Sequence, residues 1–223
     1  MAGRTITALE IQQQDKERVN VYLDGRFAFG LSRLAAAHLK TGQVLTQVEI
    51  DALCALDEVA RAVDYAARLL ARRPYSAAEI RRRLEVRRFA ASAIEQALER
   101  LTERGYIDDR AFAQYWIESR ERFSPRGQQA LRYELRQKGI ADEVIESALA
   151  ETNPLDSAVR AAQSAVRRWR GLSRTVFRQK LGAFLSRRGF DYQTVHEAVL
   201  EVIGRLENEQ PEFFAADNNT DTE

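Results

Sequence analysis

The feature that most constrains this chain is one apolar pattern that occurs three times, about fifty residues apart. Leu84, Leu135 and Leu185 serve as reference positions. In each copy, apolar residues also stand four positions before the reference leucine and five, ten and fourteen positions after it. The fifteen positions are Ile80, Leu84, Phe89, Ile94 and Leu98, then Leu131, Leu135, Ile140, Ile145 and Leu149, then Leu181, Leu185, Phe190, Val195 and Val199. An apolar content of 45% would rarely fill all fifteen by chance.

Each copy of the pattern predicts two amphipathic helices. A spacing of four residues places the apolar side chains of one helix on the same face. Short helical units cannot bury such faces alone, so they stack against their neighbours. We therefore expect a mainly α chain whose repeats form an elongated array. Arrays of this kind bind other macromolecules along their length and rarely enclose a catalytic pocket.

Residues 4–31 follow a different rule, because apolar and polar residues alternate there. Alternation is typical of strands, and Asp24-Gly25 between two such runs favours a two-residue hairpin turn with positive φ at both positions. We expect a small β-hairpin or meander. A helix capped by Ser32 should follow, run to about Lys40 and end at Gly42.

Four later helix starts carry capping residues. Thr46 and Ser76 are each followed three residues later by a glutamate, which is the spacing of a capping box. Ser124 precedes a proline, as an N-cap residue precedes proline at the first helical position. Ser173 holds the matching place in the third repeat.

The middle helices should end at a left-handed residue. Gly139 and Gly189 stand where the helices of the second and third repeats should stop, and glycine adopts positive φ at no steric cost. The first repeat has Arg88 at this position. Its turn must therefore either differ or be strained.

The net charge of +1 conceals a strong asymmetry along the chain. Residues 207–223 hold six acidic residues and no basic one, and we expect them to form a disordered tail. Residues 157–190 hold nine basic residues and no acidic one. A surface that serves only solubility normally mixes charges of both signs, so this stretch favours a binding face.

No group of residues in the sequence indicates catalysis. His38 and His196 lie far apart, and Cys54 falls on the apolar side of its helix, so no cluster spaces a zinc site. Asp108 and Asp109 are adjacent, which points their side chains apart, and one of them should cap the following helix. We therefore expect no catalytic site, no metal and no cofactor.

The composition also bounds the compartment. The sequence contains no run of eighteen apolar residues, which is about the length that a membrane-spanning helix needs. Residues 1–17 also lack the apolar core of a secretory signal. A single cysteine excludes an internal disulfide. These features favour a cytoplasmic protein without a membrane partner.

Several segments resemble, in order and spacing, the motifs of the RecX family, which regulates the bacterial recombinase RecA. The resemblance covers roughly residues 5–205. It rests on RRPYSAAEIRRRL (72–84), LTERGYIDDRAFA (101–113) and SPRGQQALRYELRQKGI (124–140), with VNVYLDGRFAF (19–29) and LKTGQVL (39–45) ahead of them.

The resemblance implies tandem three-helix repeats. The expected domains are an N-terminal hairpin with a helical extension (1–58), three repeats (59–107, 108–153 and 154–206) and the acidic tail (207–223). It also implies a non-enzymatic modulator, an inhibitor that binds the RecA–single-stranded DNA filament; we expect the chain to be a monomer. Such a protein would restrain ATP hydrolysis and strand exchange in DNA repair, recombination and the SOS response.

The expected binding residues are arginines, because the planar guanidinium suits phosphate and carboxylate partners. We expect eight that the fold does not explain to contact RecA or DNA: Arg72, Arg73, Arg81, Arg82, Arg126, Arg132, Arg168 and Arg178.

Two other classes of function compete with this interpretation. The chain could be a helical protein that binds DNA directly and independently of RecA, although no helix shows the exposed mixture of Asn, Gln and Arg that base readout favours. An enzyme has no support from the sequence.

Overall fold

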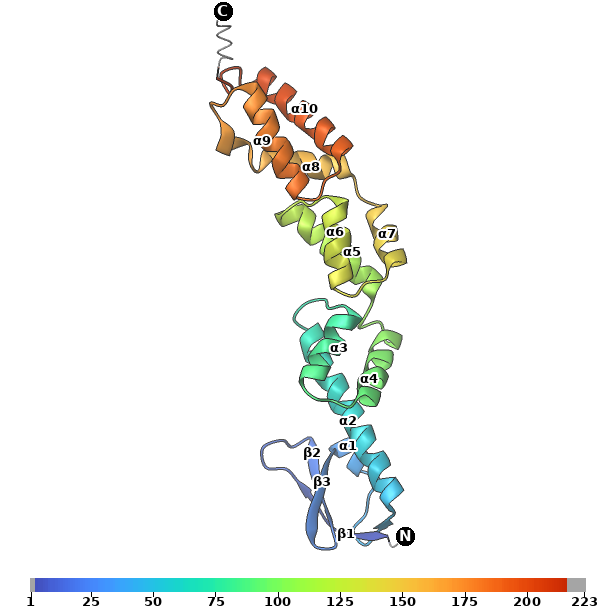
Figure 1. The fold of residues 1–223 in the computed structure, drawn as a ribbon. Coiled ribbons are helices and arrows are strands. Elements are labelled where there is room, and N and C mark those ends of the chain that lie inside the picture. The colour runs from blue at the N-terminus through green and yellow to red at the C-terminus, as the bar shows by residue number, and fades with distance from the viewer. Residues whose placement is uncertain (1–2, 216–223) are drawn as a thin grey trace, which may run out of the picture. The chain divides into compact units, whose positions relative to one another are not determined.

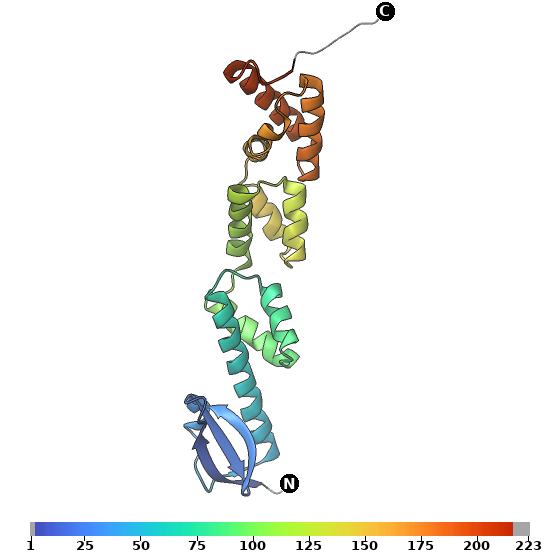
Figure 2. The same ribbon diagram turned by 90° about the vertical axis from the view of Figure 1, so that its left-hand side faces the viewer.

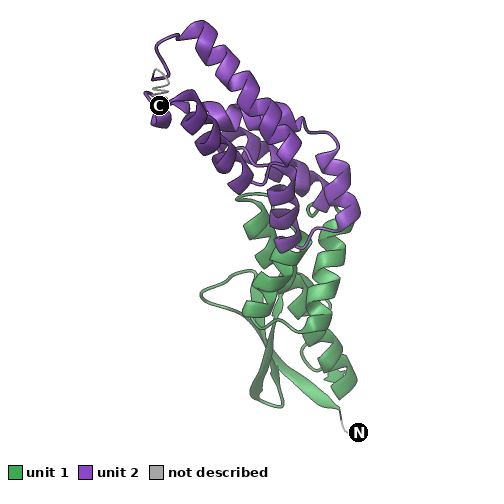
Figure 3. Ribbon diagram, turned by 45° about the horizontal axis from the view of Figure 1, so that its top comes forward, with its two compact units in different colours: residues 1–108 green, residues 109–223 purple. Residues whose placement is uncertain are grey.

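The computed structural model describes residues 3–215. The chain divides into two compact units, residues 1–108 and 109–223 (Figure 3). The first unit contains a four-stranded sheet and helices α1 to α4, and the second contains helices α5 to α10 (Figure 1). The prediction of a mainly α chain with a small N-terminal sheet is confirmed.

The sheet has the strand order β3-β2-β1-β4, and its neighbouring strands are antiparallel. Asp24 and Gly25 join the second strand to the third with φ angles of 52° and 81°, so the predicted hairpin turn is confirmed. Ile6, Val21 and Leu31 are fully buried in the core of the sheet. The strands are β1 (Arg4–Ile11), β2 (Arg18–Leu23), β3 (Arg26–Ser32) and β4 (Val44–Leu45).

The helix after the third strand is shorter than expected. Ser32 caps it as predicted, but α1 covers only Arg33–Ala36 and does not reach Lys40. The chain has to return to the sheet, where the N–H of Gly42 donates to the carbonyl of Ile6 at 2.8 Å. This backbone pairing leaves no room for further turns of helix.

The long helix α2 (Gln47–Leu70) is fastened to the sheet. Thr46 and Glu49 form the complete capping box at its start. Further along, the buried carboxylate of Asp57 accepts hydrogen bonds from the Arg18 guanidinium at 2.9 Å and from the Ser32 N–H at 2.7 Å. The Asp57–Arg18 ion pair and the hydrogen bond from Ser32, at the end of β3, thus join α2 to the sheet.

The second half of α2 belongs to the first repeat. Ala62 and Ala66 are fully buried in that repeat's core. The domain limit expected between residues 58 and 59 therefore falls inside a continuous helix.

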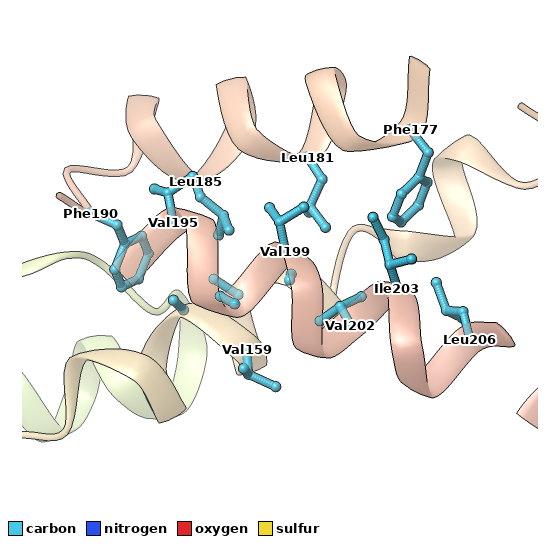
Figure 4. Packing of buried hydrophobic residues seen from close by; sticks show 14 of the residues in the cluster. Val159, Phe177, Leu181, Leu185, Phe190, Val195, Val199, Val202, Ile203 and Leu206 are labelled. Carbon is cyan, nitrogen blue, oxygen red and sulfur yellow. The ribbon is translucent and has the colours of Figure 1, made fainter. Parts of the chain in front are cut away.

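The helices of each repeat form a separate group (Figure 2), and each group has its own core of buried side chains. In the third, a row of side chains from α9 faces a row from α10, with Leu181 and Leu185 against Val195 and Val199 (Figure 4). The first repeat adds α3 (Ala77–Val86) and α4 (Ala91–Glu103) to α2; the second contains α5 (Asp109–Phe123), α6 (Gln128–Gln137) and α7 (Asp142–Leu149); the third contains α8 (Pro154–Gln163), the 3-10 helix η1 (Val166–Trp169), α9 (Arg174–Arg187) and α10 (Tyr192–Glu209).

The threefold apolar pattern is the pattern of the cores. All of its fifteen residues are buried except Phe89, which is partly buried against the first core. The prediction that these positions form the packed faces of repeated helices is confirmed.

The turn after the middle helix has the same geometry in every repeat. Arg88, Gly139 and Gly189 have φ angles of 61°, 77° and 84°. In each case the N–H of the following apolar residue donates to the carbonyl of the reference leucine, at 3.3, 3.1 and 3.4 Å respectively. This is the Schellman motif, so the Arg88 turn does not differ but is strained.

Two of the predicted repeat caps are confirmed and one is wrong. Ser76 and Ser173 each accept a hydrogen bond from an N–H three residues on. Ser124, however, lies in a loop after α5, and α6 begins four residues later with Gly127 as its N-cap. The N–H of Gly127 donates to the carbonyl of Arg188 at 2.9 Å, which holds the loop against the third repeat.

The structure also differs from the expected disordered tail in its described part. Residues 207–209 complete α10, and Phe213 is only 2% exposed, with its ring 5.5 Å from that of Phe177. The N–H of Gly171 donates to the carbonyl of Phe213 at 3.0 Å. The aromatic residues therefore extend the third core past the last helix. Residues 216–223 lie outside the described residues.

Candidate functional site

Three of the eight expected arginines are held in ion pairs within their own repeats: Arg73 with Glu79, Arg81 with Glu95 and Arg132 with Glu146. Arg81 binds both carboxylate oxygens of Glu95, and Arg132 binds those of Glu146 at 2.6 and 2.9 Å. The hydrogen bonds from these arginines lower the pKa of Glu95 and of Glu146 below the ordinary value. The Arg81–Glu95 and Arg132–Glu146 pairs occupy equivalent positions in repeats one and two, so the fold accounts for these arginines.

Arg73 also has a local structural role. Its guanidinium lies 3.6 Å from the ring centroid of Tyr75 and donates to the carbonyl of Pro74 at 2.8 Å and to Glu79 at 3.3 Å. The ring of Tyr75 is itself buried. Arg73 thus fixes the turn between α2 and α3.

Three other expected residues lie at the surface of separate elements. Arg72 follows α2, Arg82 lies on α3 and Arg178 lies on α9, and all three are exposed.

Arg126 and Arg168 each lie near a third arginine, Arg188. Arg188 donates to the hydroxyl of Ser124 at 3.3 Å and to the carbonyl of Pro125 at 3.0 Å, directly beside Arg126. Burial, and after it the positive charges of Arg126 and Arg168, lower the pKa of Arg188. We call Arg126, Arg168 and Arg188 the junction cluster, because Arg126 belongs to the second repeat and the other two to the third.

Close backbone contact holds the junction cluster in place. A Cβ atom added to Gly127 would lie 2.0 Å from the carbonyl oxygen of Gly189, and one added to Gly189 would lie 2.6 Å from the backbone nitrogen of Ala130. Such contacts allow only glycine at these positions. The loop that carries Arg126 is therefore fixed against the turn that carries Arg188.

Carboxylates do not neutralise the junction cluster. Within residues 3–215, none of its three arginines makes an ion pair, and the Nε atom of Arg126 is buried without a hydrogen-bond partner. Asp191 is the acidic residue nearest in sequence to Arg188, but its carboxylate caps α10 through the N–H and hydroxyl of Thr194. The positive charge thus remains available to a ligand.

Arg188 was not among the eight expected residues, although the repeat pattern contains a signal for it. A basic residue ends the middle helix of every repeat: Arg87, Lys138 and Arg188 are the C-cap residues of α3, α6 and α9. Each cation also lies over an aromatic ring, at 5.1 Å from Tyr65, 4.7 Å from Trp116 and 4.6 Å from Phe184 respectively. A basic residue just before the left-handed turn is therefore part of the repeat.

Other kinds of site find little support in the part of the chain that the structure describes. Residues 3–215 contain no group of three or more His, Cys, Asp or Glu side chains arranged to hold a metal ion. Among the same residues, no helix combines the length and the apolar character that crossing a bilayer requires.

Comparison with family models matches four segments of the chain. Residues 4–46 match "Regulatory protein RecX N-terminal domain", and residues 62–101, 108–149 and 151–199 match the first, second and third three-helix domains of RecX. The three helical matches correspond to the three repeats.

Relatives named "Regulatory protein RecX" agree with this result. The protein of Chlorobium phaeobacteroides is 40% identical over 144 residues, which cover 64% of this chain and 93% of the relative. The protein of Bacillus pumilus is 30% identical over 212 residues, which cover 93% of this chain and 81% of the relative.

Solved structures show the same fold. A crystal structure of regulatory protein RecX matches with a TM-score of 0.70 at 26% identity, covering 91% of this chain and 99% of that one. RecX from Lactobacillus salivarius matches with a TM-score of 0.61 at 20% identity, covering 66% of this chain and 98% of that one. With its N-terminal domain and all three helical repeats matched, the chain belongs to the RecX family of regulatory proteins.

Proposed function

We propose that this protein is a non-enzymatic modulator of the RecA recombinase. It binds the RecA filament on single-stranded DNA in the cytoplasm and restrains ATP hydrolysis and strand exchange during recombinational repair. The observation that carries the proposal is the match to all four RecX domains in their natural order.

The distribution of charge supports a partner that is a large polyanion or an acidic surface. The nine basic residues of the acid-free stretch 157–190 all lie in the third repeat, on α8, η1 and α9 or at the C-cap positions of η1 and α9. Exposed arginines such as Arg178 would speed association with such a partner and make binding sensitive to salt. A filament of RecA on DNA offers phosphates and acidic side chains together.

The test is the ATP hydrolysis rate of preformed RecA filaments on single-stranded DNA while the full chain is titrated in. We expect a dose-dependent fall, together with co-sedimentation of the protein with the filament. Half-inhibition far below one molecule per RecA would indicate capping of filament ends, and half-inhibition near saturation would indicate binding along the groove.

A charge-matched pair of variants tests the electrostatic part. R72Q/R178Q removes two exposed arginines, whereas R174Q/R205Q removes two arginines that are already paired with Glu207 and Glu201. We expect the first variant to inhibit less well than the second at physiological salt. An unchanged hydrolysis rate and no co-sedimentation with the wild-type protein would refute the proposal, and tight binding to DNA alone would then favour a RecA-independent DNA-binding protein.

A further inference from the structure

We infer that Arg126, Arg168 and Arg188 form a phosphate-binding site that takes the backbone of single-stranded DNA. The site rests on the proposed function in one respect, because the strand that it would contact is the one within the filament. It goes beyond that function in assigning the residues, the chemical group that they bind and the place of the site between two repeats.

The charge of the junction cluster is unbalanced. Arg188 donates to the loop that carries Arg126 and lies over Phe184, whose ring contacts Trp169 beside Arg168, and none of the described carboxylates pairs with the three arginines. Like charges brought together at a half-buried position repel each other, and an anion bound among them removes this repulsion. Elsewhere in the same unit, arginines that approach carboxylates do form pairs, as Arg132 does with Glu146. Exposed arginines of the same unit, such as Arg178, also lack an ion pair among the described residues, but the junction cluster differs from them because Arg188 is partly buried and the Nε atom of Arg126 is buried.

The hydrogen-bond donors of the junction cluster are arranged to suit an anion. Arg188 spends one nitrogen on the Ser124 hydroxyl and the Pro125 carbonyl, which holds its guanidinium in position. Arg126 has no protein acceptor for its buried Nε atom, so a ligand that draws its side chain outward costs it no hydrogen bond. Arg168 is exposed and can reach the ligand from the side of η1. A phosphate, with several acceptor oxygens, suits such a convergent set of planar donors.

The aromatic rings beside the junction cluster favour a nucleic-acid strand over an acidic protein surface as its ligand. The guanidinium of Arg188 lies 4.6 Å from the ring of Phe184, and that ring lies 5.7 Å from the ring of Trp169, the residue after Arg168. Phe184 and Trp169 are both only partly buried. Cations that alternate with accessible aromatic rings are typical of surfaces that bind single-stranded nucleic acid, where phosphates meet the cations and bases stack on the rings.

The site would also couple two repeats. Arg126 comes from the loop between α5 and α6, and its partners come from η1 and the end of α9. A phosphate held by all three would join the second repeat to the third. Binding should therefore raise the thermal stability of the chain as well as retain the strand.

The experiment measures binding of the full chain to fluorescein-labelled oligothymidylate by fluorescence anisotropy over a range of salt concentrations. Loss of each guanidinium that holds the phosphate should weaken binding roughly tenfold or more, and R126Q/R168Q removes two of them. The double variant should also flatten the slope of log affinity against log salt by up to about 0.7, since the three arginines hold one phosphate and each phosphate neutralised on a single strand contributes about 0.7. The control R174Q/R205Q removes the same charge from the same unit and should leave both quantities near the wild-type values. R168Q alone changes only an exposed side chain, and it should show half of the change in slope even if the double variant folds poorly.

Three results would overturn the inference. The first is wild-type affinity and slope in R126Q/R168Q and in R168Q. The second is an equal rise in melting temperature with inorganic phosphate and with oligothymidylate at the same phosphate concentration, which would assign the site to free phosphate. The third is a variant that binds oligothymidylate normally but fails to bind the RecA filament, which would assign the cluster to an acidic protein surface. If oligothymidylate binding behaves as expected and the wild-type protein leaves RecA ATP hydrolysis unchanged, the proposed function fails and the site remains.

Discussion

Replacing Gly189 by alanine should test how tightly the second and third repeats are joined. Gly189 has φ of 84°, and a Cβ atom there would lie 2.6 Å from both the Cβ and the backbone nitrogen of Ala130 in α6. Gly171, in the same repeat, has φ of 80° and nothing within 4 Å of its added Cβ. The two glycines thus share a backbone conformation and differ in crowding.

The expected magnitudes follow from this difference. A left-handed conformation costs a non-glycine residue about 1–2 kcal/mol, and the stiffer unfolded chain returns about 0.4–1 kcal/mol of that. G171A should therefore lower the free energy of unfolding by about 1 kcal/mol. G189A should lower it by a further 1–3 kcal/mol or so, because the backbone of Ala130 has to move to admit the methyl group.

Urea unfolding followed by tryptophan fluorescence can measure both changes in stability. The chain has two tryptophans, Trp116 in the second repeat and Trp169 in the third, so W169F and W116F backgrounds report each repeat separately. We expect the urea midpoints of the second repeat, reported by Trp116, and of the third repeat, reported by Trp169, to lie closer together in G171A than in G189A. Only G189A disturbs the contact between the two repeats. An equal fall in stability in the two variants would show that the contact between Gly189 and Ala130 does not constrain the repeats.

Three further predictions concern single residues. R88G should raise the free energy of unfolding by about 0.5–1 kcal/mol, because φ of 61° strains an arginine but not a glycine; a loss of stability in urea unfolding would mean that the turn is not strained. D191A should cost about 1 kcal/mol by removing the cap of α10. The hydrogen bond from the Thr194 N–H lowers the pKa of Asp191, so the stabilisation by this cap is complete above the ordinary pKa of 3.8 and is lost as pH falls through the lower folded-state pKa. The melting temperatures of the wild type and D191A should therefore converge in acid. A difference that stays constant with pH would contradict the assignment. F213A should cost about 3–5 kcal/mol if its ring is part of the third core, whereas an unchanged melting temperature would restore the expectation of a disordered segment there.

The repeats could be predicted because their cores follow one spacing. Positions such as Leu84 and Leu135 are fully buried, and the sequence pattern alone identifies them, since a helix repeats its apolar face at a fixed interval. The turn at Asp24-Gly25 could also be predicted, because few pairs of residues readily adopt positive φ at both positions.

The errors have a common physical cause, which is contact between elements distant in sequence. Ser124 is followed by a proline, a sound local signal for a helix start, yet the loop is used to reach Arg188 in the next repeat. Phe213 stands in an acidic, polar segment, yet it completes a core whose other members begin at Ala158, 55 residues earlier. Local composition carries no information about such partners.

The candidate site shows the same division. The sequence identified a basic surface, but it could not separate arginines that carboxylates already hold, such as Arg81, from those that none holds, such as Arg168. This distinction depends on which helices face each other. The same packing brings in Arg188, whose importance arises only where the two repeats meet.

The shared helix α2 has a consequence for how the first unit moves. Its first half is fastened to the sheet through Asp57, and its second half supplies Ala62 and Ala66 to the first repeat. A continuous helix bends little over such a length, so neither end can turn without carrying the other. The N-terminal sheet and the first repeat should therefore move together as one rigid body. A force applied to the sheet would reach α3 and α4 through α2, without a hinge between them.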